Sequence, residues 1–424
     1  MIKNQKFLTS AKRGKKMNLF ENFGLSHELL TVINRLGFTE PTQIQRRSIP
    51  HIIKQSDVIG ESATGSGKTL AFGCGITEKV KSHAGLQALI LTPTRELAEQ
   101  VKGSLRQLSH GIKLNIIAVY GGVSINPQID DLIKAEVVVA TPGRLLDHLQ
   151  RGTIDLSRIK VLVLDEADRM FDMGFYEDVE KIIINCPLDR QTLFFSATIS
   201  SRVKNLANKY MKKPVIVSAR RYVDPNKLKQ VYYNVQRNMK LSLLVHLLQH
   251  ERSGLVMVFC NTRRNTDFVV KNLRANKVSA IAIHGGFTQN KRTKSIALFN
   301  NAKVGVLVCT DVAARGLHID NVSHIYNFDI PKDAKDYVHR IGRTSRMERA
   351  GKAISLVEDE EMNMIRRIEL FMNKDIKRYY LSQKERDEDR SKYKRYPRVK
   401  SSSKAQNLED EEYPETIADT SIYG

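Results

Sequence analysis

The sequence predicts an α/β protein of two tandem domains, each built on a parallel sheet covered by helices. A chain of 424 residues exceeds what one hydrophobic core normally serves. Short runs rich in Val, Ile and Leu alternate with longer helical stretches, as in parallel sheets with crossover helices, and the alternation begins again after a break. The expected strands are 88–92, 116–120, 137–140, 161–164 and 192–195 in the first domain, and 255–260, 279–283, 304–309, 324–328 and 353–357 in the second.

The expected domain boundaries follow changes in composition. A basic N-terminal arm at 1–18 precedes a first domain at 19–218, a linker at 219–229 with little apolar periodicity, and a second domain at 230–372. In the tail, 373–424, Lys and Arg alternate with tyrosines before an acidic end, which is typical of disorder. Such a tail either contacts single strands by charge and stacking or is an inert solvated segment.

The composition favours a polyanionic partner and a reducing compartment. The formal net charge of +22, from 68 Lys and Arg against 46 Asp and Glu, suits phosphate contacts; a merely soluble basic surface is the alternative. The four cysteines show neither zinc-ligand spacing nor a disulfide framework. No apolar stretch approaches the roughly 18 residues of a membrane span. A cytoplasmic location is therefore expected, and the N-terminal arm is interpreted as nucleic-acid-binding, with an organellar transit peptide as the alternative.

A glycine-rich turn and an acidic strand end together predict a nucleotide hydrolase. Lys68 is expected to reach the β- and γ-phosphates among backbone amides of the turn, and Thr69 to offer its hydroxyl to Mg²⁺. Asp165 is expected to hold Mg²⁺, partly through water, and Glu166 to orient the attacking water. Ser62 stands where the Walker pattern has its first glycine. The residues expected to surround the phosphates are Ser62, Ala63, Thr64, Gly65, Ser66, Gly67, Lys68 and Thr69.

The segment Asp165-Glu166-Ala167-Asp168 and its extension 169–175 resemble the DEAD-box RNA helicases, a resemblance that runs from about Phe20 to Val357. It implies two RecA-like domains, ATP and Mg²⁺ as cofactors, and RNA-stimulated ATP hydrolysis. The choice of RNA rests on the resemblance, because residue types cannot show recognition of a 2′-hydroxyl. A DNA repair or transcription helicase is disfavoured on the same ground.

The resemblance also implies how the base is read. Gln45, in a segment similar to the family's Q motif that includes Thr42, would read adenine, because an amide can donate to N7 and accept from N6. Phe20 and Phe38 would pack around the base. Without the family, both phenylalanines would be assigned to the core and Gln45 to a helix surface.

In the second domain, the resemblance implies that Arg343 and Arg346 approach the γ-phosphate when a cleft between the domains closes. Composition alone would make them ordinary surface arginines. Gly316 and His318 would contact the nucleotide, and His318 replaces the aspartate that the family places near the ribose. We expect this change to weaken or re-pattern the ribose contact without abolishing turnover. The residues expected to couple the acidic strand to the cleft are Asp168, Ser196, Thr198 and His339.

The expected RNA contacts follow the strands of both domains and offer amides, hydroxyls and arginines to a phosphate backbone. None of them suits a base edge, so binding should be tolerant of sequence. Taken singly, most of these residues are helix caps or turns, and their joint order along the chain is what resembles the family. They are Pro93, Thr94, Arg95, Gly121, Gly122, Thr141, Pro142, Gly143, Arg144, Asn261, Thr262, Gln289, Arg292, Thr310 and Asp311.

Two interpretations of function remain at this point. The leading one is a monomeric ATP-dependent RNA helicase that grips a strand, melts short duplexes or remodels RNA–protein complexes, and releases after hydrolysis. Ribonucleoprotein or ribosomal assembly components are the expected further partners, with ribosome biogenesis or RNA decay as the setting. The other is an ATP-gated clamp on RNA with little unwinding. Both use the same residues and differ in release rate.

Overall fold

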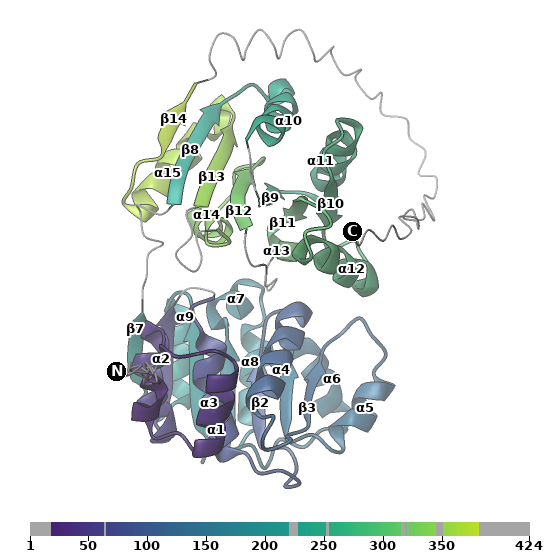
Figure 1. Cartoon of the computed structure of the whole chain (residues 1–424). Coiled ribbons are helices and arrows are strands. Elements are labelled where there is room, and N and C mark those ends of the chain that lie inside the picture. The colour runs from purple at the N-terminus through teal and green to yellow at the C-terminus, as the bar shows by residue number, and fades with distance from the viewer. Residues whose placement is uncertain are drawn as a thin grey trace, which may run out of the picture. The chain divides into compact units, whose positions relative to one another are not determined.

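The computed structural model describes residues 18–62, 65–219, 228–251, 254–314, 319, 322–344 and 351–380. Within them the chain forms two parallel seven-stranded sheets, and Figure 1 shows helices on both faces of each sheet. The predicted α/β class with two tandem sheets is therefore confirmed. None of the helices in these ranges is both long and apolar enough to cross a membrane.

The first sheet has the strand order β3-β4-β2-β5-β6-β1-β7. Its strands are mostly buried and rich in Val, Ile and Leu, as expected where helices cover both faces. Neighbouring strands pair in parallel throughout. The strands are β1 Val58–Ser62, β2 Ala88–Leu91, β3 Ile116–Val119, β4 Val137–Ala140, β5 Val161–Asp165, β6 Gln191–Ser196 and β7 Val215–Ala219.

Two apolar cores lie on the two faces of this sheet. Along β5, Val161 and Val163 belong to one core while Leu162 and Leu164 belong to the other, because successive side chains of a strand point to opposite faces. The first core is covered by η1 Leu19–Phe23, α1 His27–Arg35, α2 Gln43–Ile53, α3 Lys68–Lys79 and α4 Arg95–Leu108. The second is covered by α5 Asn126–Leu132, α6 Pro142–Gln150, α7 Ala167–Asp172, α8 Tyr176–Ile184 and α9 Ser201–Tyr210.

The second sheet has the order β10-β11-β9-β12-β13-β8-β14, also with parallel pairing. Its strands are β8 Leu228–Asn234, β9 Leu255–Cys260, β10 Ala280–Ile283, β11 Val306–Thr310, β12 Val322–Asn327, β13 Gly351–Val357 and β14 Lys377–Tyr379. Its helices are η2 Arg237–Met239, α10 Lys240–His250, α11 Arg263–Ala275, α12 Gln289–Asn300, α13 Asp311–Ala314, α14 Ala334–Ile341, η3 Asp359–Glu361 and α15 Met362–Met372.

The structure differs from the sequence-based expectation at the sheet margins. Strands β1, β7, β8 and β14 were not expected. The expected linker is shorter, because Ala219 ends β7 and Leu228 begins β8; residues 220–227 lie outside the described ranges. The expected tail also begins later than residue 373, because Lys377–Tyr379 pairs with β8. This strand has no apolar run, so pairing along the edge of β8 defines it. The N-terminal arm up to residue 17 and the tail from residue 381 lie outside the described ranges.

Candidate active site

The glycine-rich turn joins β1 to α3 at the carboxyl end of the first sheet. Gly67 precedes α3 with φ +92°, a conformation that favours glycine. Lys68 is buried, and its Nζ donates to the Ser62 carbonyl at 3.2 Å. The hydroxyls of Ser62 and Ser66 lie 2.8 Å apart. A helix N-terminus with a buried ammonium beside it is a favourable site for a phosphate group.

The start of α2 packs directly on this turn. Thr42 and Gln45 form a capping box, in which the Thr42 amide donates to Gln45 Oε1 at 2.8 Å. The Nε2 atom of Gln45 donates to the Gly67 carbonyl at 2.9 Å, and the Thr42 hydroxyl donates to the Ser66 carbonyl at 2.7 Å. An amide nitrogen carries two hydrogens and an amide oxygen two lone pairs, so Gln45 retains capacity for a base while it holds the turn.

The two phenylalanines expected near the base differ in exposure. Phe20 is fully buried in the first core and meets Phe23 edge-on, with ring centroids 5.7 Å apart. Phe38 is 45% exposed. Phe38 is therefore accessible to a base as it stands, whereas a contact from Phe20 would require the surrounding core to open. Both contacts stay predictions.

The acidic strand end places two buried carboxylates beside the turn. Burial raises the pKa of Asp165 to about 6 despite the Lys68 ammonium, and the Glu166 carboxylate adds to the rise. Burial would also raise the pKa of Glu166, but Arg169 and Lys68 outweigh it and lower that pKa to about 2. Arg169 Nη1 lies 2.6 Å from Glu166 Oε2. Glu166 is therefore ionised at neutral pH.

Glu166 also has an unusual backbone. Its φ of +54° and ψ of +48° lie in the left-handed region, which costs a non-glycine residue about 1–2 kcal/mol. Glu166 is the residue that precedes α7, and the buried ion pair with Arg169 fixes its side chain. The sequence analysis did not single out Arg169, although its spacing of three residues from Glu166 is one at which helical neighbours meet.

Three of the four expected coupling residues meet at the ends of β5 and β6. The Asp168 Oδ2 atom accepts hydrogen bonds from both the amide and the hydroxyl of Thr198, each at 2.9 Å. The Asp168 amide donates to the Ser196 hydroxyl at 3.2 Å. The fourth residue, His339, lies on α14 of the second domain. The contacts tie the acidic strand end to its neighbouring strand.

The expected RNA-contact residues of the first domain follow β2, β3 and β4, which are neighbours in the sheet. Thr94 caps α4 after Pro93, and Thr141, Pro142 and Gly143 begin α6. The guanidinium group of Arg95 lies over Gly122, where an added Cβ would be 1.9 Å from Nη1, and φ is +78°. The geometry requires glycine at residue 122, and it brings Arg95 and the Gly121-Gly122 loop together.

In the second domain the expected RNA-contact residues also follow the strands. Thr262 caps α11 by accepting from the Asn265 amide at 3.1 Å. Arg263, which the sequence analysis did not single out, lies 3.4 Å from the position of an added Cβ on Gly285. Gln289 and Arg292 lie in the first turns of α12, Thr310 ends β11, Asp311 begins α13, and Arg343 follows α14.

Arg340 is a third residue that the sequence analysis did not single out, after Arg169 and Arg263. Its side chain is 1% exposed. The guanidinium group donates twice to the Asp311 carboxylate, at 2.6 Å each, and to Asn261 Oδ1 at 2.9 Å, Asn327 Oδ1 at 3.2 Å and the Asp329 carbonyl at 2.6 Å. The ends of β9, β11 and β12 are thereby held by one side chain. Arg340 directly follows His339, an expected site residue, so its place in the same motif was the sequence signal that could have identified it.

Five of the expected site residues lie outside the described ranges: Ala63, Thr64, Gly316, His318 and Arg346.

A phosphate turn and paired carboxylates on one parallel sheet, followed by a second sheet of the same kind, define a nucleoside triphosphatase with tandem RecA-like domains. Two family models match the chain, DEAD/DEAH box helicase over residues 42–206 and helicase conserved C-terminal domain over residues 239–348. The chain belongs to the DEAD-box ATP-dependent RNA helicase family. It is accordingly an ATPase, as the sequence predicted.

Relatives and solved structures agree with this assignment. The DEAD-box ATP-dependent RNA helicase CshA of Geobacillus kaustophilus is 43% identical over 357 residues, which make up 83% of this chain and 76% of that protein. CshA of Bacillus subtilis is 43% identical over 82% of this chain and 72% of its own length. The structure of S. cerevisiae Dbp5 bound to RNA and ADP BeF3 is similar at a TM-score of 0.78 and 30% identity, covering 88% of this chain and 98% of that one.

Proposed function

We propose that the chain couples hydrolysis of ATP, bound with Mg²⁺ on the first domain, to local unwinding of short RNA duplexes or remodelling of RNA–protein complexes. The observation that carries this proposal is the meeting of Lys68, Asp165 and Glu166 at the carboxyl end of the first sheet. Ligands of open α/β sheets bind at such ends. The family supplies RNA as the substrate of the coupled work.

The residues present fit a triphosphate with Mg²⁺. Lys68 would exchange its bond to the Ser62 carbonyl for the β- and γ-phosphate oxygens. Thr69 and Asp165 are hard oxygen donors, and Mg²⁺ favours a few such donors together with water and phosphate. When bound, the ion would neutralise charge on the phosphates. Glu166, anionic and fixed by Arg169, would accept a hydrogen bond from the attacking water and orient it.

The base and the partner domain would complete the site. Gln45 would read adenine with its remaining hydrogen and lone pair, and Phe38 would cover the base. Arg343 and Arg346 would stabilise the charge of the transferring phosphoryl group when the domains close around ATP. ATP would then favour the closed state by its higher affinity for it, and hydrolysis would release it. His318 would alter the ribose contact.

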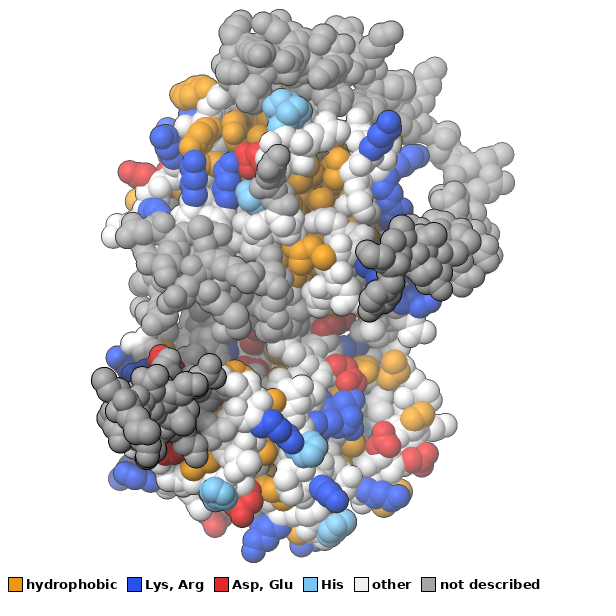
Figure 2. All heavy atoms as spheres, viewed as in Figure 1, with side chains coloured by type: hydrophobic (Ala, Val, Ile, Leu, Met, Phe, Trp, Pro, Cys, Tyr) orange, Lys and Arg blue, Asp and Glu red, His pale blue; other side chains and the backbone are white. Residues whose placement is uncertain are grey.

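RNA would lie along the strand ends of both domains and be held by its backbone. The chain is strongly basic, and Lys and Arg side chains are widespread on the face shown in Figure 2, which suits phosphate contacts. Mss116p, similar at a TM-score of 0.77 and 29% identity over 87% of this chain and 80% of that one, has been solved bound to ssRNA and AMP-PNP. We further propose a monomer that acts in the cytoplasm on ribonucleoprotein or ribosomal assembly components.

The test is ATP turnover by the full chain with no nucleic acid, with single-stranded RNA, and with single-stranded DNA of equal length. Glu166→Gln is the blank, and Glu180→Gln, which removes the same charge from the middle of α8, where Glu180 pairs with Lys209, is the matched control. We expect stimulation by RNA alone, lost in the blank and kept in the control. Equal stimulation by DNA would refute RNA specificity. An absence of turnover with every strand would refute the coupled enzyme in favour of an RNA clamp.

A further inference from the structure

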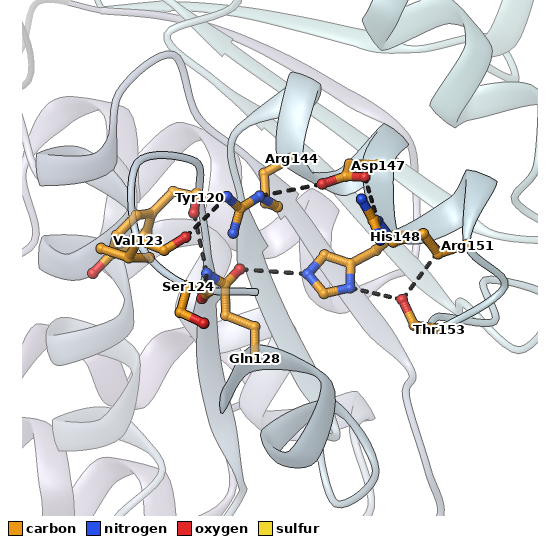
Figure 3. A network of polar contacts seen from close by, with 9 residues as sticks. All are labelled: Tyr120, Val123, Ser124, Gln128, Arg144, Asp147, His148, Arg151 and Thr153. Atoms are coloured by element: carbon orange, nitrogen blue, oxygen red, sulfur yellow. Dashed lines mark hydrogen bonds and ion pairs between the residues drawn. The ribbon is translucent and has the colours of Figure 1, made fainter. Parts of the chain in front are cut away.

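A buried polar network lies behind the glycine loop that follows β3 (Figure 3). Gln128 on α5 donates through Nε2 to the carbonyls of Tyr120 at 3.2 Å and Ser124 at 3.3 Å. Its Oε1 atom lies 3.4 Å from Nε2 of His148 on α6. The Nδ1 atom of His148 lies 2.8 Å from the Thr153 hydroxyl. Hydrogen-bonding contacts thus connect Thr153, which follows α6, through His148 and Gln128 to the carbonyls of the loop.

The pattern of donors assigns the protonation of His148. Both hydrogens of the Gln128 amide go to carbonyls, so its oxygen must accept, and His148 must carry its proton on Nε2. Nδ1 then accepts from the Thr153 hydroxyl, which also lies 3.1 Å from the His148 carbonyl and shares its one hydrogen between these two acceptors. The neutral ring suits its place, because burial and the Arg144 guanidinium lower the pKa of His148. The charged groups that act on the ring are Arg144, Asp147 and Arg151.

The two carbonyls that Gln128 holds bracket the glycine loop. Tyr120 precedes Gly121 and Gly122, and Ser124 follows them by two residues. Between them, the Val123 carbonyl accepts from Arg144 Nη2 at 3.0 Å, so α5 and α6 together hold three of the loop's carbonyls. With three carbonyls each accepting a hydrogen bond from α5 or α6, the loop has little freedom to change conformation.

Arg144 supplies a second, independent observation. Its Nη2 atom is used on the loop, while its Nη1 atom is buried and has no hydrogen-bond partner among the described residues. An unpaired buried donor is costly in the absence of a ligand. A phosphate oxygen of a bound strand would satisfy it after a small rotation of the Arg144 side chain, because Nη1 has almost no accessible surface. Gln128 and His148 have no such unpaired atom and lie behind the loop, which separates their role from that of Arg144.

We propose that Gln128 and His148 are positioning residues for RNA: they hold the loop of residues 120–124 in the conformation in which its glycines and Arg144 receive a phosphate backbone. This inference rests on the proposed function, since it names what fixes one part of the RNA site. Both side chains are buried, so neither is placed to touch the strand or the nucleotide. Their loss should therefore weaken RNA binding at full occupancy of ATP and spare turnover at saturating RNA.

The test compares Gln128→Met with Gln191→Met in the full chain. Gln191 is a matched control because its buried Nε2 also donates to two carbonyls, those of Ile52 at 2.9 Å and Ser56 at 2.8 Å, at the amino end of the strands. With single-stranded poly-uridine as the probe, Gln128→Met should raise the RNA concentration for half-maximal ATP turnover by roughly tenfold or more. The maximal rate and the RNA-free rate should stay unchanged, and Gln191→Met should show none of this.

Variants of His148 form the second part of the experiment. His148→Gln keeps an amide donor close to the place of Nε2 and should restore most of the RNA affinity, whereas His148→Leu should resemble Gln128→Met. Hydrogen exchange at residues 120–125 without RNA should quicken in Gln128→Met and His148→Leu and stay unchanged in Gln191→Met. Unchanged half-maximal RNA in Gln128→Met, or an equal rise in Gln191→Met, would overturn the proposal.

Separate measurements test RNA coupling and the positioning role of Gln128 and His148. If RNA does not stimulate the unaltered chain, the proposed function fails. The exchange measurement then still decides the positioning role of Gln128 and His148, because it needs no RNA. Unchanged exchange in the loop of both variants would overturn that role even where RNA stimulates turnover.

Discussion

Replacing Arg340 with Met should selectively loosen the second domain. All five N–H groups of this guanidinium are used, on one carboxylate, two amide oxygens and a carbonyl. Arg340→Met leaves the Asp311 carboxylate without its guanidinium partner. Removing one partner of a buried pair costs about 3–5 kcal/mol. The Asp311 side chain is 19% exposed, so water offsets part of the loss and the lower value, about 3 kcal/mol, is expected. Because each 1.4 kcal/mol is about a factor of ten, exchange of the protected amides should quicken by roughly two orders of magnitude.

The assay is native-state hydrogen exchange followed by mass spectrometry on the full chain. Peptides from β9, β11 and β12 report the effect, and peptides from β2 and β5 of the first domain are the internal reference. Arg274→Met is the control, because Arg274 is exposed and its Nε donates only to the Ala280 carbonyl, at 2.9 Å. If exchange in the three strands quickens no more in Arg340→Met than in Arg274→Met, the reasoning from buried pairing is wrong.

Three further predictions concern the first domain. Gly67→Ala places a Cβ 2.3 Å from Gln45 Nε2 at φ +92°, with about 1–2 kcal/mol of backbone strain in addition, and should raise the KM for ATP by roughly tenfold in steady-state assays. Thr198→Val removes a hydroxyl donor to the Asp168 carboxylate, worth about 1.5–3 kcal/mol, and should lower the thermal midpoint by several degrees in calorimetry, whereas Thr198→Ser should not. The pKa of His148 is lower in the folded chain than the ordinary histidine value of 6.5, so the unfolded chain binds this proton at a higher pH than the folded chain does. The free energy of unfolding should therefore decrease as the pH falls below 6.5. Urea titrations of His148→Gln at several pH values should lack this part of the decrease.

The central strands could be predicted from the sequence because each is a continuous apolar run buried on both faces. Strand β1 escaped prediction because it contains a glycine and a glutamate; Gly60 is required there, since an added Cβ would lie 2.5 Å from the ring of Phe195. Strand β14 could not be predicted because it has no apolar pattern and forms by pairing with β8. Both depend on contacts between residues far apart in the chain.

The same limit applied at the site. The phosphate turn and the acidic strand end are compact motifs, so their chemistry could be predicted from spacing alone. The pairing of Gln128 with His148 joins two helices across twenty residues and has no periodic signal. Arg340 lies in the motif that resembles the family, but the resemblance assigned roles to Arg343 and Arg346 and not to Arg340. Roles that depend on which buried atoms face one another required the structure.

The shared strand order of the two sheets has a consequence for the chain's origin. Counted from its own first strand, each sheet runs 3-4-2-5-6-1-7. In both, a threonine caps the helix after the second strand, an arginine follows it, and that arginine lies against a pair of glycines after the third strand. We infer a duplicated ancestral unit. Both copies retain this arrangement, whereas the first strand leads to a phosphate turn only in the first copy, since β8 is followed by Val235 and Gln236.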